Sequence, residues 1–160
     1  MSDPSEIIER RLKAVVHGGS AKGLHFFVQI GGAYHTYGML TLQVSASGWV
    51  ILGWRKEDDQ ILHSVQLPTR DQLRLYEVML ELPFWRASAP RRPRRDEDEL
   101  NVHVRLADQV AGTWSGVQFW SQDLPSQPTL QAFMSRMHRL AGAIATPEFP
   151  LPPWGNTLDA

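Results

Sequence analysis

Residues 100–106 alternate strictly between apolar and polar side chains, with Leu100, Val102, Val104 and Leu106 as the apolar set. A period of two is typical of a strand with one buried and one solvent-facing side. Five further segments carry the same pattern or a weaker form of it: 24–30, 39–44, 49–55, 61–67 and 113–121. The connections between consecutive strands are short, which favours antiparallel hairpins over parallel crossovers.

Three other segments have helical periodicity. The first, about residues 4–17, follows the capping pair Asp3-Pro4 and ends at Gly18-Gly19. The second starts at Thr69-Arg70-Asp71-Gln72, a capping-box pattern in which the Gln72 side chain is expected to reach back to Thr69, and Pro83 stops it. The third starts near Pro128 and carries an apolar stripe that ends at Ile144.

The order of elements is therefore one helix, four strands, a helix, two strands and a helix. It predicts an α+β fold, with a single domain over residues 1–146, three helices and an antiparallel sheet of five to six strands. Residues 49–55 are largely apolar on both faces, which predicts a central strand. Residues 86–99 are rich in Arg, Pro and acids and predict an exposed loop inside the domain, whereas 147–160 form a Pro-rich C-terminal tail.

Composition removes several classes of function. The chain has no cysteine, which excludes disulfides, thiolate catalysis and Cys-ligated metal sites. Its formal charge of -1 lacks the broad basic footprint of a general nucleic-acid binder. No apolar run is long enough to cross a membrane, and the N-terminus is charged where a signal peptide needs an apolar stretch, so a cytoplasmic protein without a membrane partner is expected.

No catalytic or metal-binding motif is found, and no cofactor is predicted. The stretch Gly18–Gly23 has the wrong spacing and the wrong flanking elements for a phosphate-binding loop, and in Gly112–Gly116 the serine falls one place late for a nucleophile elbow. The histidines are isolated, without the spacings that bring metal ligands together. They are His17, His25, His35, His63, His103 and His138.

Two groups of residues are candidates for contact with a partner. Trp54, Trp114 and Trp120 lie on strands, where large indoles either pack under a helix or form a binding surface. The second group is the run Arg91, Arg92, Arg94 and Arg95. Four acids follow this run directly and neutralise much of its field, so a solvated loop is the competing interpretation. The tail segment 147–154 has the proline spacing of a polyproline II ligand, or it docks on its own domain.

The element order, the segment 67–82 and the segment 130–145 preceded by Leu124-Pro125 resemble the class I type III secretion chaperones. This resemblance implies a non-catalytic dimer that binds an extended partner segment on hydrophobic patches. The chain departs from that family in having four strands before the second helix where the family usually has three, a near-neutral charge and the Arg-rich loop. No functional residues carry over from the family.

These observations leave two main hypotheses. The first is a non-enzymatic protein-binding module, chaperone-like or immunity-type, with an exposed aromatic or edge-strand surface and a homodimer as an open possibility. The second is a small enzyme or ligand-binding domain with a site on the sheet face around His103, Arg105 and Gln118. Nucleic-acid binding through 91–95 is the least favoured.

Overall fold

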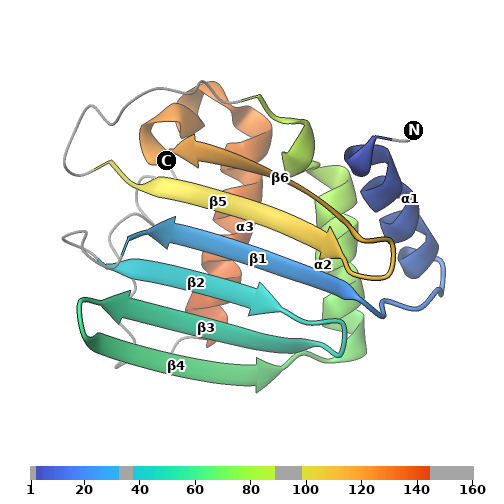
Figure 1. Ribbon diagram of the computed structural model, residues 1–160, viewed down its shortest axis with the longest axis horizontal. Helices are drawn as coiled ribbons and strands as arrows, with labels where there is room; N and C mark the ends of the chain where they lie inside the picture. Colours follow the sequence, from blue (N-terminus) through green and yellow to red (C-terminus); the bar gives the residue numbers. More distant parts are fainter. Residues whose placement is uncertain (1–2, 33–37, 89–98, 145–160) are drawn as a thin grey trace.

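The computed structural model describes residues 3–32, 38–88 and 99–144 (Figure 1). Its elements follow the order α1 (Pro4–Val16), β1 (Leu24–Gly31), β2 (Met39–Val44), β3 (Trp49–Lys56), β4 (Asp59–Gln66), α2 (Thr69–Glu81), the 3-10 turn η1 (Phe84–Arg86), β5 (Asn101–Asp108), β6 (Thr113–Trp120), the 3-10 turn η2 (Ser121–Ser126) and α3 (Pro128–Ile144). The predicted α+β fold, with its antiparallel sheet and its order of strands and helices, is confirmed.

The six strands form one sheet in the order β4-β3-β2-β1-β5-β6, and every neighbouring pair is antiparallel. Strands β1 to β4 form a meander of consecutive hairpins. The β5–β6 hairpin then adds to the other side of β1, where Phe26 pairs with Leu106 and Val28 with Val104. This seam joins two parts of the chain that are far apart in the sequence.

All three helices lie against one face of the sheet, behind it in Figure 1. The apolar residues of β1, β2 and β5 that alternate in the sequence point to this face and are buried with the helix stripes in one core. At its centre, the ring of Phe133 lies 5.9 Å from that of Phe26 and 4.8 Å from that of Phe84. Burial on this face therefore follows from the strand alternation and the helical stripes together.

The start of α2 differs from the predicted capping box. Pro68 is the N-cap residue and makes no side-chain cap bond. The Gln72 side chain turns the other way, and its amide donates to the carbonyl of Ala46 at 2.8 Å and to the hydroxyl of Tyr76 at 3.0 Å. Gln72 is buried under the β2–β3 turn, so its amide meets those unpaired oxygens instead of the backbone of Thr69.

The prediction that residues 49–55 form a central strand was wrong. The strand β3 lies next to the edge strand β4, and the central pair is β2 and β1. Its inner residues Val50 and Leu52 are buried, whereas Trp49 and Ile51 on the other side are exposed. Both faces of β3 are apolar because one packs in the core and the other forms an apolar surface.

Candidate functional site

The outer face of the sheet is the side opposite the helices. We define it as the odd-numbered residues of β1, β2, β3 and β5 together with the even-numbered residues of β4 and β6. No helix in the described part of the chain covers this face (Figure 1). An antiparallel sheet with one solvated face normally carries polar residues there.

Large apolar side chains nevertheless stand on the outer face. Leu62 is 63% exposed and Trp114 is 58% exposed, and Trp49 and Ile51 are also exposed. The other large hydrophobic residue that is exposed within the described ranges, Val110 at 65%, lies in the β5–β6 turn. Most of the exposed apolar surface of the described strands is therefore concentrated on one side of the sheet.

The same face carries no carboxylate. The chain has 17 Asp and Glu residues, yet none occupies an outer-face position as defined above. Arg55 and Arg105 are there instead, together with His25 and His103. The face therefore bears positive charge although the whole chain is slightly acidic.

A concavity of about 530 Å³ opens on the outer face at β1, β5 and β6, and we call it the Arg105 pocket. Its side chains come from two neighbouring cross-strand rows. In one row Gln29 pairs with His103, which pairs with Gln118; in the next Phe27 pairs with Arg105, which pairs with Gly116. Gly116 has no side chain, and β6 lies so close to β5 there that a Cβ would overlap the carbonyl oxygen of Val104.

The guanidinium of Arg105 is held by aromatic rings. Its central carbon lies 5.5 Å from the centroid of the Trp114 ring and 5.9 Å from that of Phe27. Such cation–π contacts favour a fixed position of the charge over free motion in solvent. The amide of Gln118 is also oriented, since it donates to Asn101 Oδ1 at 3.2 Å.

The structure brings together His103, Arg105 and Gln118 of the second hypothesis, with Trp114 of the first. Trp54 lies on the opposite side of the sheet, partly buried against the core, and Trp120 is partly buried at the end of β6. The two Trp residues 54 and 114 therefore belong to different surfaces. Several residues named from the sequence lie outside the described ranges: His35, Arg91, Arg92, Arg94, Arg95 and the tail 147–160.

Sequence reasoning missed several members of the outer face. Phe27 and Gln29 line the Arg105 pocket, and Trp49, Ile51 and Leu62 are exposed on β3 and β4 of the same face. The signal was present in the alternation of 24–30 and in the apolar second face of β3. A strand that is buried on both sides also has two apolar faces, so the pattern alone does not distinguish burial from an exposed apolar surface.

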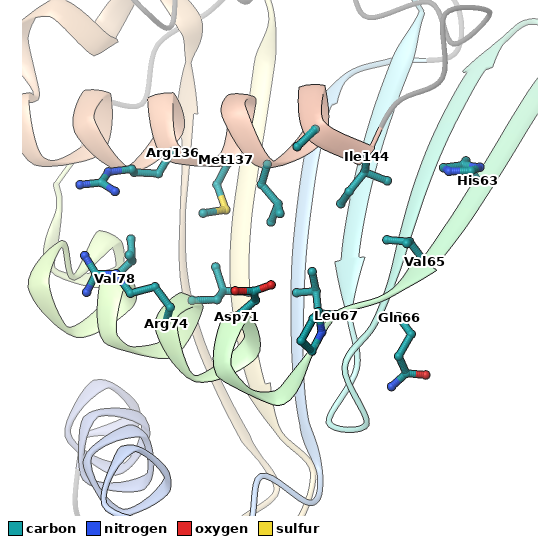
Figure 2. Close-up of a pocket in the computed structure, with 14 residues that line it drawn as sticks. His63, Val65, Gln66, Leu67, Asp71, Arg74, Val78, Arg136, Met137 and Ile144 are labelled. Atoms are coloured by element: carbon teal, nitrogen blue, oxygen red, sulfur yellow. The ribbon is translucent and has the colours of Figure 1, made fainter.

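A second apolar surface lies between β4, α2 and α3, and we call it the α2–α3 groove (Figure 2). Its volume is about 620 Å³. Val65, Leu67, Met137 and Ile144 are among its apolar lining residues, and Arg74 is one of the polar residues at its rim. It forms where β4 extends past the two helices.

Within residues 3–32, 38–88 and 99–144, no three His, Asp or Glu side chains gather in a way that would hold a metal ion. None of the helices described there is long and apolar enough to cross a membrane. No protein-family model matches the chain, and no curated protein matches its sequence at a significant level.

Proposed function

We propose that this protein is a non-enzymatic protein-binding module that acts by contact through the outer face of its sheet. The observation that carries the proposal is the outer face, which no helix of the described ranges covers and which carries exposed large apolar side chains and no carboxylate at its strand positions. Exposed large apolar side chains that gather on one face mark interaction sites in folded domains, and Trp is enriched among the residues that dominate binding energy.

The electrostatics of the face support a partner with negative charge. An interface gains specificity and association rate when a positive patch meets a negative one. Arg55 and Arg105 present positive charge at two separate strands of the face. On this proposal the protein masks an acidic and partly apolar surface of its partner, as a chaperone-like or immunity-type protein does.

Affinity purification from the native host tests the proposal with matched variants. Wild type is compared with Leu62→Ser and Trp114→Ser on the outer face and with Val110→Ser, an equally exposed apolar residue in the β5–β6 turn. We expect wild type and Val110→Ser to recover the same partner and the two outer-face variants to lose it. A partner retained by both outer-face variants, or none in repeated preparations, contradicts the proposal.

A further variant separates the outer face from the α2–α3 groove. Leu140→Glu places a charge in the groove and leaves the outer face unchanged. We expect this variant to keep the partner. If it alone loses the partner, the groove is the binding site and the outer face is not.

A second candidate function is a ligand-binding domain with its site in the Arg105 pocket. The specific observation that favours it is the convergence of His103, Arg105 and Gln118 in one concavity with aromatic walls. Pockets for small molecules combine such walls with a few polar groups. NMR titration with a set of small aromatic carboxylates tests it: saturable shifts of the Trp114 indole support it, and unchanged spectra contradict it.

A further inference from the structure

Arg105 is positioned differently from those arginines of α1, α2 and η1 that pair with acids. Arg11, Arg70, Arg74 and Arg86 each form an ion pair with a carboxylate. Within the described ranges Arg105 has no such ion pair, and its recorded contacts are the rings of Trp114 and Phe27. Its charge is therefore positioned but not neutralised.

Aromatic contact leaves the hydrogen-bonding capacity of this guanidinium available. A guanidinium that stacks on aromatic rings uses its flat faces, whereas its five N–H donors lie in its plane and match the two oxygens of a carboxylate. The neighbouring His103 and Gln29 add polar groups, and no acid on the outer face competes for the cation. These are the properties of a receptor for an anion.

We infer that the Arg105 pocket binds an Asp or Glu side chain of the partner protein, with an adjacent apolar residue against Trp114 and Phe27. This inference rests on the proposed function. Arg105 supplies one positioned cation, which matches the single charge of a carboxylate, whereas a phosphate carries about -1.5 to -2 at neutral pH. Exposed apolar residues stand on the same sheet face, which fits a protein segment better than a free small anion.

Two capped synthetic peptides test the inference on the purified full chain. The acidic probe is Ac-Leu-Glu-Phe-Glu-Leu-amide, and its neutral counterpart carries Gln in place of each Glu. NMR follows the Arg105 Nε–H and the Trp114 indole N–H, while sodium acetate and a phosphoserine-substituted peptide are titrated as separate arms. We expect the acidic peptide to shift both signals and to bind roughly tenfold or more tightly than the Gln peptide, because charge-assisted hydrogen bonds contribute on that scale.

Variants then assign the preference to Arg105. Arg105→Gln should bind the two peptides about equally, and Arg105→Lys should retain part of the preference because it keeps the charge without the planar fork. Arg10→Gln, at an exposed arginine of α1 on the helical side of the sheet, is the matched control and should keep the full preference. Thermal melts of each variant verify that it is folded before its binding is compared.

The inference is overturned if neither peptide binds, if both bind equally to wild type, or if the shifts occur outside the Arg105 pocket. Tighter binding of the phosphoserine peptide, or a response to acetate equal to that of the acidic peptide, also overturns it. The affinity purification tests the proposed function independently of these peptide titrations. A host partner that is lost with Leu62→Ser but kept with Arg105→Gln supports contact through the outer face and rejects carboxylate recognition.

Discussion

The carboxylate of Asp108 is buried at the end of β5, where the sheet meets α1. It accepts hydrogen bonds from Arg11 at 3.2 and 3.3 Å and from the backbone N–H groups of Val110 at 3.0 Å and Ala111 at 3.1 Å. We expect Asp108→Ala to lower the free energy of unfolding by about 3 kcal/mol, since it leaves a partly buried cation and two backbone donors unpaired. Urea denaturation measures this change.

The variant Asp108→Asn is the control for that prediction. Its amide oxygen can still accept from the β5–β6 turn, whereas its amide nitrogen replaces an oxygen that accepts from Arg11, so the ion pair is lost and the turn bonds are kept. We expect a cost of about 1 kcal/mol. Equal destabilisation by the two variants would show that the turn bonds contribute nothing measurable.

Glu9 gives the fold a pH dependence at the contact between α1 and η1. Hydrogen bonding from the Arg86 side chain lowers the pKa of Glu9 below its usual 4.5, and Trp85 donates to the same carboxylate at 2.9 Å. A carboxyl group whose pKa is lowered by folding stabilises the fold above the unfolded-state pKa and loses that contribution as pH falls through the folded-state pKa.

We therefore expect wild type to exceed Glu9→Gln in stability at neutral pH, and the difference to disappear as pH falls below about 4.5. Gln keeps an acceptor for Trp85 but loses the charge and one of the two oxygens that accept from Arg86, so the comparison isolates the contact with Arg86. Urea midpoints of both proteins across this pH range provide the measurement. A difference that stays constant from neutral to acidic pH would reject the assignment.

Among the secondary-structure elements, β5 and β6 approach each other closely at Gly116. A Cβ at this position would overlap the carbonyl oxygen of Val104 and lie 3.0 Å from the Cα of Arg105, so the backbone of β5 must move to admit it. We expect Gly116→Ala to destabilise the protein by about 2 kcal/mol or more and to distort the Arg105 pocket.

Gly142 in α3 is the matched control, because a Cβ there meets no atom within 4 Å. Gly142→Ala should stabilise the protein by about 0.5 kcal/mol, since Ala loses less backbone entropy in a helix. The same change from Gly to Ala should therefore lower the free energy of unfolding at Gly116 and raise it at Gly142. Thermal or urea unfolding measures both effects and so tests the contact between the strands. A neutral effect at Gly116 would mean that the two strands separate easily.

Local periodicity was enough to predict each helix and strand, because the alternation in 100–106 and the apolar stripe of α3 both depend on neighbours close in sequence. The position of each strand in the sheet was not accessible in this way. The pairing of β1 with β5 joins segments more than 70 residues apart in the numbering, and no local pattern encodes that partner. This pairing places Phe27 beside Arg105, so the candidate site was predictable only in part.

At the scale of the whole molecule, the sheet combines two units that are each formed by strands close in sequence, and the pairing of β1 with β5 joins them. One is the β1 to β4 meander and the other is the β5–β6 hairpin, and the helices cover the inner face of both. Strand pairing and burial are unequal across this sheet. β1 is paired on both sides and has every second residue buried, whereas β4 is paired only with β3 and has no fully buried residue.

Native-state hydrogen exchange should therefore reveal two classes of strand. We expect amides of β1 and β5 to exchange only through global unfolding, and those of β4 to open at a free energy several kcal/mol lower, because few buried contacts hold this edge. Exchange followed by NMR in rising urea separates the two classes. Equal opening energies for β4 and β1 would contradict the unequal sheet, whereas added protection at β3 and β4 in the presence of a partner would locate the contact on the apolar side of the outer face.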